Sequence, residues 1–218
     1  MIGAQEDWYA RELPLDGAIV ADVGANVGAL SEFFHARVGP RGAVVSIEPL
    51  DEHRERLQTL ASGAPRWRVE SCAISARDGE IELFAARQAG VWSSVVAPGG
   101  GRVVPCRRLV SVVPDATVVK LDIEGHEYEV LDDSLDAMPD VAAWALELHM
   151  VTGRPLERAL AGLSARGYAL FAAGRRVGGG DAWVSAPIPP ELSWSHVPEA
   201  GRRPDGAPTK MLHVLAKR

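Results

Sequence analysis

Two kinds of apolar pattern alternate over the first third of the chain. Residues 18–23, 43–48 and 67–70 are short, largely apolar segments, which is typical of buried strands. Residues 27–37 and 51–60 instead carry apolar side chains at the spacing of an amphipathic helix. Because consecutive strand–helix–strand units connect parallel strands by right-handed crossovers, this part of the chain predicts a parallel sheet.

The rest of the chain extends this sheet and predicts antiparallel strands at its end. The strongest strand pattern covers 117–123, and a helical pattern over 126–135 and a strand over 141–149 follow it. A hairpin around 178–180 and a last strand over 210–215 predict an antiparallel C-terminal edge. Together the patterns predict an α/β fold with an open, doubly wound, mostly parallel sheet of seven strands. The other predicted elements are strands over 80–84 and 101–106 at the margin of that sheet, a helix over 155–165 and a strand over 168–171.

Composition and charge narrow the class of protein. The chain has 218 residues, 47% hydrophobic and 24% charged, so we expect one soluble domain spanning residues 1–218. The net charge of −6 disfavours nucleic acid and anionic membrane surfaces as partners, because an acidic chain does not neutralise phosphates. No apolar run is long enough to span a bilayer, and the N-terminus lacks the pattern of a signal peptide. Cys72 and Cys106 form no metal-binding pattern, and we expect a reducing, cytoplasmic setting.

The turn at residues 22–28, directly after the first predicted strand, has the composition of a cofactor site. Gly24 allows a tight turn against which a ligand can lie, Gly28 allows close helix–strand packing, and Asn26 tolerates left-handed backbone angles. The turn lacks the G-x-G-x-x-G spacing of a dinucleotide site, and Asp22 would repel a pyrophosphate. That carboxylate suits the ammonium and sulfonium groups of S-adenosylmethionine. The predicted cofactor-binding residues of the turn are Asp22, Gly24, Ala25, Asn26 and Gly28.

Two later strand ends are expected beside this turn. The second strand ends in Glu48-Pro49, and an acid in that place is positioned to bind ribose hydroxyls. An NAD site shares this feature, so only its combination with the turn favours S-adenosylmethionine. Ala73 and Ile74 follow the third strand, at a position that usually lines the adenine in this fold class.

Four segments of the chain resemble the FkbM-type methyltransferases, in the expected order. They are residues 22–28, Glu48-Pro49, residues 119–131 and residues 146–149. The third segment is the most specific, because its pattern K-x-D-x-E-G-x-E is much rarer than a glycine turn. The resemblance implies a class I methyltransferase fold, which is Rossmann-like. It also implies methylation of a hydroxyl on a small molecule, such as a sugar or a natural-product scaffold.

Acidic and basic side chains at the ends of two neighbouring strands are the candidates for the chemistry. Asp122 would face the methyl donor, so we expect it to bind the cofactor and to take part in catalysis. A hydroxyl acceptor benefits from a base, and histidine suits this role near physiological pH. We expect His149 or His126 to remove the acceptor proton, and Glu147 or Asp122 to orient that histidine. Lys120 is expected to pair with Asp122 or Glu147, because an unpaired lysine in a buried strand is costly.

A magnesium ion offers a second route to the same chemistry. Bound near this strand end, it would lower the pKa of the acceptor hydroxyl. The spacing of the carboxylates carries no specific metal signature, so we rank this route second and assign no metal. The side chains that could supply ligands are Asp122, Glu124, Glu147 and His149.

Segments outside the core strands are the candidates for closing the site. Residues 1–16 and 185–209 are predicted lids, since long irregular segments in compact domains are commonly functional. Aromatic side chains in such segments exclude water and stack on a ring or sugar. The predicted substrate-binding residues are Trp92, Ser93, Glu124 and Trp194.

Three other functions stay open at this point. An N-methyltransferase would favour an Asn/Asp-Pro-Pro-aromatic motif after the fourth core strand, where this chain has residues 122–125. An NAD-dependent oxidoreductase is disfavoured by Asp22 and by the missing middle glycine. A methyltransferase-like module without turnover would show a broken cofactor turn. We expect a small molecule as the partner, and the oligomeric state, a homodimer included, stays open.

Overall fold

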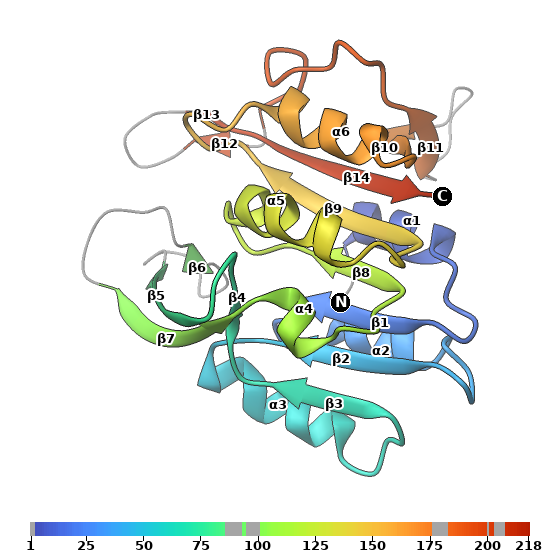
Figure 1. Cartoon of the computed structure of the whole chain (residues 1–218), viewed down its shortest axis with the longest axis vertical. Coiled ribbons are helices and arrows are strands. Elements are labelled where there is room, and N and C mark those ends of the chain that lie inside the picture. The colour runs from blue at the N-terminus through green and yellow to red at the C-terminus, as the bar shows by residue number, and fades with distance from the viewer. Residues whose placement is uncertain (1–2, 86–92, 95–100, 176–182, 200, 203–207) are drawn as a thin grey trace.

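The structure, a computed structural model, describes residues 3–85, 93–94, 101–175, 183–199, 201–202 and 208–218 (Figure 1). Its centre is an eight-stranded sheet in the order β11-β10-β14-β9-β8-β1-β2-β3. The strands of this sheet are β1 Ile19–Val23, β2 Ala43–Ile47, β3 Trp67–Glu70, β8 Val118–Leu121, β9 Ala143–His149, β10 Ala169–Arg175, β11 Trp183–Pro187 and β14 Met211–Lys217.

Five neighbouring strands of this sheet, β3, β2, β1, β8 and β9, run parallel. β14 pairs antiparallel with both β9 and β10, and β11 pairs antiparallel with β10. This confirms the predicted doubly wound, mostly parallel sheet with an antiparallel C-terminal edge. The predicted count of seven strands is wrong by one, because residues 183–187 after the hairpin pair fully with β10 and form an eighth strand.

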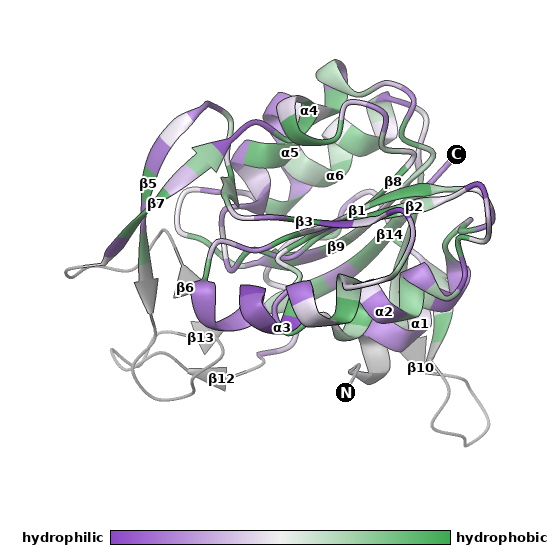
Figure 2. Ribbon diagram, turned by 90° about the horizontal axis from the view of Figure 1, so that it is seen from below, coloured by the Kyte–Doolittle hydropathy of each residue, from purple (hydrophilic) through white to green (hydrophobic). Residues whose placement is uncertain are grey.

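Helices cover both faces of the sheet (Figure 2). A larger hydrophobic cluster lies on the α4, α5 and α6 side, and a smaller one lies on the α1 and α2 side. β8 is buried along its whole length, as its apolar sequence predicts for a central strand. No helix within the described part of the chain is long and apolar enough to cross a membrane. The helices are α1 Ala4–Glu12, α2 Ala29–His35, α3 Asp51–Ala61, α4 Leu109–Val112, α5 Glu127–Ala137 and α6 Leu156–Ala165.

The strands predicted at the margin of the central sheet instead form a sheet of their own. Its order is β4-β7-β5-β6, and Figure 2 shows β5 and β7 extending away from the central layer. β7 pairs parallel with β4 and antiparallel with β5, so its backbone groups are satisfied without β3. A separate small cluster, which contains Leu83 and Val104, packs this sheet. The bounds are β4 Ala73–Ile74, β5 Gly79–Ala85, β6 Ser93–Ser94 and β7 Arg102–Arg107, and a further pair is β12 Gly201–Arg202 with β13 Pro208–Thr209.

Candidate active site

A cavity of about 400 Å³ lies at the carboxyl ends of the central parallel strands. Its wall combines the turn after β1 with the segments that follow β2, β3 and β8. Parallel strands bring their carboxyl ends to one edge, so segments far apart in sequence meet here. The predicted site residues in this wall are Gly24, Ala25, Asn26, Glu48, Pro49, Ala73, Ile74, Asp122, Glu124, His126 and Glu147.

Gly24 sits where the turn after β1 passes close to the end of β8. Its φ is +77°, and a Cβ atom there would lie 1.9 Å from the carbonyl oxygen of Asp122. The N–H groups of Gly24 and Ala25 both donate to the carbonyl of Ile47, at 3.0 and 3.1 Å. The turn is therefore fixed between the ends of β2 and β8, and a residue with a side chain does not fit at position 24.

Gly28 serves the packing of two helices. Its φ is +88°, and a Cβ atom would approach side-chain carbons of Leu57 and Leu60 in α3 to 2.8 and 2.9 Å. Gly28 is not among the residues that line the cavity. The predicted helix–strand packing is therefore corrected to packing between α2, which begins at Ala29, and α3.

Asp22 lies beneath the turn rather than in the cavity wall. Its side chain is fully buried, Ser31 Oγ donates to it at 2.5 Å, and Lys120 Nζ lies 3.8 Å from its Oδ1. Burial raises the pKa of Asp22, and the charge of Lys120 opposes this shift. The predicted direct attraction between Asp22 and a cationic cofactor is therefore not what the geometry provides. This carboxylate anchors the base of the turn, and other acids face the cavity.

Glu48 lines the cavity and is held by two backbone donors. Its Oε2 accepts the N–H of Asn26 at 2.9 Å, and its Oε1 accepts the N–H of Leu50 at 3.0 Å. The residue is 5% exposed, and burial raises the pKa of its carboxyl group. Each carboxylate oxygen still has acceptor capacity, so a ligand hydroxyl can donate to the held group.

His126 connects the segment after β3 with the start of α5. It lines the cavity, its Nε2 lies 3.1 Å from Ser75 Oγ, and its Nδ1 lies 3.4 Å from Glu129 Oε2. Burial lowers the pKa of His126, which favours the neutral imidazole. Ser75 directly follows Ile74, so this hydrogen bond ties the predicted acceptor end of the cavity to the predicted adenine end.

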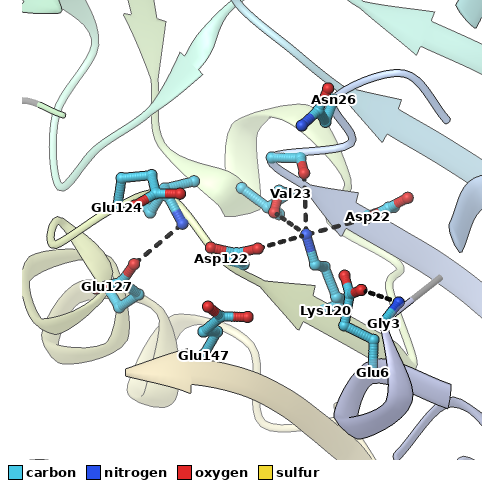
Figure 3. Close-up of polar contacts among 12 residues, drawn as sticks. Gly3, Glu6, Asp22, Val23, Asn26, Lys120, Asp122, Glu124, Glu127 and Glu147 are labelled. Carbon is cyan, nitrogen blue, oxygen red and sulfur yellow. Dashed lines mark hydrogen bonds and ion pairs between the residues drawn. The ribbon is translucent and has the colours of Figure 1, made fainter. Parts of the chain in front are cut away.

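Three further carboxylates of the cavity wall lie near one another (Figure 3). They belong to Asp122 and Glu124, which follow β8, and to Glu147 of β9. Burial raises the pKa of Asp122 to about 6 and that of Glu124 to about 7. Burial alone would also raise the pKa of Glu147, but the hydrogen bond and charge of His213 take it below its ordinary value. Glu124 has a φ of +58°, an uncommon backbone conformation for a residue other than glycine.

Lys120 is buried between the cofactor turn and these carboxylates (Figure 3). Its Nζ donates to the carbonyl oxygens of Gly24 at 2.9 Å and Val23 at 3.5 Å. It lies 3.4 Å from Asp122 Oδ2 and 3.8 Å from Asp22 Oδ1, which confirms the predicted pairing with Asp122. Burial alone would lower the pKa of Lys120, but Asp122 and Asp22 raise it above its ordinary value. Lys120 is therefore a fixed cation that joins β1 to β8.

His149 is surrounded by carboxylates at the end of β9 and does not line the cavity. Its Nδ1 lies 3.0 Å from Glu127 Oε1, and its Nε2 lies 3.3 Å from Glu124 Oε2 and 3.6 Å from Glu147 Oε1. Burial alone would lower the pKa of His149, but the hydrogen bond to Glu127 and the nearby charges raise it to about 10. A protonated imidazole has no lone pair for a substrate proton. The surroundings therefore favour His126 over His149 as a base.

The residues predicted to bind substrate or to close the site lie in different places. Trp92 lies outside the described residues, and Ser93 belongs to β6 but its side chain is not described. Trp194 packs partly buried against the larger hydrophobic cluster and is not in the cavity wall. In the predicted N-terminal lid, Trp8 and Tyr9 are buried in the smaller cluster rather than lying over the cavity. Closure by residues 1–16 or 185–209 stays a prediction.

Several residues of the site were given no role from the sequence, and one of them, Glu127, lies within the K-x-D-x-E-G-x-E pattern. Glu6 of α1 and Met211 of β14 line the cavity, although they come from opposite ends of the chain. His213 of β14 binds Glu147 Oε2 at 2.9 Å. Glu127 is fully buried, and its carboxylate accepts the N–H groups of Ile123 and Gly125 at 3.0 to 3.1 Å. Only the tertiary fold reveals these contacts.

The chain is similar to one curated protein over part of its length and to solved structures of methyltransferases over most of its length. The antimetabolite synthetase AmbE of Pseudomonas aeruginosa is 42% identical over 81 residues, which is 35% of this chain and 4% of the synthetase. This chain thus spans a small part of that relative. A precorrin-6y C5,15-methyltransferase of Geobacter metallireducens matches at 13% identity and a TM-score of 0.47, over 96% of this chain and 86% of the other. An S-adenosylmethionine-dependent O-methyltransferase of Thermotoga maritima matches at 14% identity and a TM-score of 0.47, over 96% of this chain and 63% of the other.

A family model gives the decisive match. The methyltransferase FkbM domain matches residues 22–170, from the end of β1 to the start of β10. That segment contains the turn after β1, Glu48 and the carboxylates that follow β8, and it includes every residue of the described cavity wall except Glu6 and Met211. Because the match covers more than half of the chain, this protein belongs to the FkbM methyltransferase family.

Proposed function

We propose that this methyltransferase transfers a methyl group from S-adenosylmethionine to a hydroxyl of a small molecule, such as a sugar or a natural-product scaffold. The observation that carries the proposal is that one cavity is lined by two kinds of residue. The glycine turn, Glu48 and the apolar residues Ala73 and Ile74 are assigned to its cofactor end. The other end has ionisable groups that are able to orient and deprotonate an acceptor. A cofactor that spans the first end brings its methyl group to the second.

The adenosine part of the cofactor is proposed to lie along Glu48, Ala73 and Ile74. Its ribose hydroxyls would donate to the carboxylate of Glu48, which two backbone N–H groups already hold in place. The methionine part would lie over Gly24 to Asn26, where the backbone is accessible from the cavity. Its ammonium group would face the cavity acids, Asp122 among them.

Glu48→Gln is expected to weaken binding of S-adenosylhomocysteine by about 10- to 100-fold, because charge-assisted hydrogen bonds contribute roughly 1.5–3 kcal/mol. Isothermal titration calorimetry measures the change directly. Glu32→Gln, an exposed acid in α2, is the matched control and should bind as wild type. Equal affinities for wild type and Glu48→Gln would remove Glu48 from the cofactor site.

His126 is proposed to accept the proton of the acceptor hydroxyl. Two histidines of the described chain line the cavity: His126 follows β8 and has its ring fixed by Ser75, whereas His53 lies 3.6 Å from Glu48, which is proposed to bind the cofactor. Methyl transfer needs an acceptor oxygen in line with the methyl group and water excluded, so a well-placed base adds to a reaction that is already activated.

His126→Asn is expected to lower kcat by about 10²- to 10⁴-fold while S-adenosylhomocysteine binding changes little. His35→Asn, in α2 and outside the cavity wall, is the control. The assay is mass spectrometry of a panel of sugars and hydroxylated natural products incubated with enzyme and S-adenosylmethionine, with matched amines for comparison. Methylation of amines alone would overturn the hydroxyl assignment, and wild-type turnover by His126→Asn would overturn the base.

A further inference from the structure

His149 has the surroundings of a metal ligand. Its Nδ1 lies 3.0 Å from the buried carboxylate of Glu127, so the ring is oriented from one side. Its Nε2 is buried and, within the described chain, makes no hydrogen bond. Oxygens of Glu124 and Glu147 lie 3.3 and 3.6 Å from that nitrogen. Metal-binding histidines commonly donate the second ring N–H to a carboxylate in this way, which leaves the other nitrogen for the cation.

The distances around Nε2 fit two ligands of one cation. The carboxylate oxygens lie 3.3 and 3.6 Å from His149 Nε2. If each ligand atom lies ~2.1 Å from the metal, the angle at the metal between Nε2 and either oxygen is about 100–120°. That range lies close to tetrahedral geometry. Donor atoms of Asp122 and His149 also lie within 4.8 Å of each other, and Asp122 Oδ1 is buried without a hydrogen bond inside the described chain. Oxygens of Asp122, Glu124 and Glu147 therefore each lie within 4.8 Å of a ring nitrogen of His149, beside the cavity.

Glu127 belongs to the same group but is better suited to orient the imidazole than to bind a cation. One of its oxygens accepts the N–H groups of Ile123 and Gly125 and faces His149 Nδ1, and the other accepts the N–H of Gly125. Its side chain is completely buried. The structure thus separates a group that would touch the cation from a group that positions it.

The remaining carboxylates are held in the same manner. His213 Nε2 binds Glu147 Oε2 at 2.9 Å, which leaves Oε1 toward His149. Lys120 lies 3.4 Å from Asp122 Oδ2, which leaves Oδ1. Lys120 also lies 3.8 Å from Asp22 Oδ1, so its one positive charge is shared between two carboxylates. A divalent cation would add positive charge beside these acids.

We propose that this cluster binds one divalent transition-metal cation, of which Mn²⁺ is the representative. Its ligands are Asp122, Glu124, Glu147 and His149. An imidazole among carboxylates suits Mn²⁺ or Zn²⁺ better than Mg²⁺, which prefers oxygen ligands and retains its waters. Binding of the cation would release the imidazole proton of His149.

The place of the cation suggests its use. Asp122, Glu124 and Glu147 line the acceptor end of the cavity, so a cation held between them would be within reach of the acceptor oxygen. When bound, it would lower the pKa of a hydroxyl acceptor. This use rests on the proposed O-methylation, whereas the binding of the cation does not.

Mn²⁺ binding tests the site without an acceptor. Titration of the full chain with Mn²⁺, followed by the loss of the electron paramagnetic resonance signal of free Mn²⁺, should show about one ion per chain. Glu124→Gln and His149→Gln should each weaken binding at least tenfold, and Glu127→Gln should weaken it by about 10- to 100-fold through the orientation of His149. Glu157→Gln, an exposed acid of α6, is the matched control and should bind as wild type.

Thermal unfolding keeps the test independent of folding defects. The metal-free Tm of each variant shows whether it folds, and Glu124→Gln should lose the rise in Tm that Mn²⁺ gives to the wild-type protein. Absence of Mn²⁺ binding to the wild-type chain at millimolar concentration, or wild-type Mn²⁺ affinity in both Glu124→Gln and His149→Gln, would overturn the site. Tighter binding of Mg²⁺ than of Mn²⁺ would also overturn it, because an imidazole ligand favours Mn²⁺. Binding of S-adenosylhomocysteine measured in parallel separates a failed metal site from a failed cofactor site.

Discussion

Gly24→Ala is expected to destroy the cofactor turn while most of the protein stays folded. The new methyl group would lie 1.9 Å from the carbonyl oxygen of Asp122, and this oxygen belongs to backbone that cannot move alone. Left-handed backbone angles cost a non-glycine residue about 1–2 kcal/mol, and a forced backbone shift costs roughly 1–3 kcal/mol more. A total loss of about 2–5 kcal/mol is within the stability of an ordinary domain. The turn and the end of β8 must therefore move apart.

Binding of S-adenosylhomocysteine should fall by at least about 100-fold in Gly24→Ala, because the displaced turn is proposed to hold the methionine part. Calorimetry and urea unfolding measure the two effects. Gly153→Ala is the matched control, since Gly153 has a φ of +78° but nothing within 4 Å of an added Cβ atom. It carries the backbone strain without the collision, so it should lose about 1–2 kcal/mol and keep its affinity. An equal loss of affinity in both variants would contradict the collision as the cause.

The sequence was sufficient for most of the fold because buried strands and amphipathic helices have local patterns. The first strand and helix, at Ile19–Val23 and Ala29–His35, lie within or close to their predicted ranges. Pairing between strands has no such local pattern. Residues 102–107 look like any margin strand, yet their backbone pairs with residues 79–83 and 73–74 rather than with β3. The extra strand β11 was missed for the same reason.

The candidate site was predictable to the extent that it follows strand ends. Glu48, Asp122 and Glu147 each end or follow a core strand, and all three line one cavity. The direction in which each side chain points was not predictable, because a side chain at a strand end faces either the cavity or the layer of helices below the sheet. Asp22 shows this: it follows the same rule of position but lies buried on Ser31.

Contacts between charged side chains of different elements also could not be predicted from the sequence. His149 was predicted as a base because histidine titrates near neutral pH, but three carboxylates, from the segment after β8, from α5 and from β9, surround it. Glu127 had an adequate local explanation as an acid in the first turn of a helix. Its contact with His149 requires α5 and β9 to be packed together, and no spacing rule encodes that distance.

Lys120→Met is expected to lower the free energy of unfolding by about 3–5 kcal/mol, the usual cost of leaving buried charges unpaired. The side chain of Lys120 is 3% exposed and lies between Asp122 and Asp22, of which Asp22 is fully buried. Its ammonium group also donates to the carbonyls of Gly24 and Val23, so the cofactor turn loses a second support. Urea unfolding followed by circular dichroism measures the loss.

A surface ion pair provides the control for Lys120→Met. Lys217 Nζ lies 3.1 Å from Glu12 Oε2 with both side chains partly exposed, so Lys217→Met should cost less than about 1 kcal/mol. If Lys120→Met does not fold, the double variant Lys120→Met with Asp22→Asn decides the matter. Removal of one buried carboxylate together with its cation should restore a large part of the lost stability, because the cost arises from the uncompensated anion and not from the absent side chain. If the double variant is as unstable as Lys120→Met, the loss is instead assigned to packing. If Lys120→Met itself is within about 1 kcal/mol of wild type, the two carboxylates do not need the cation.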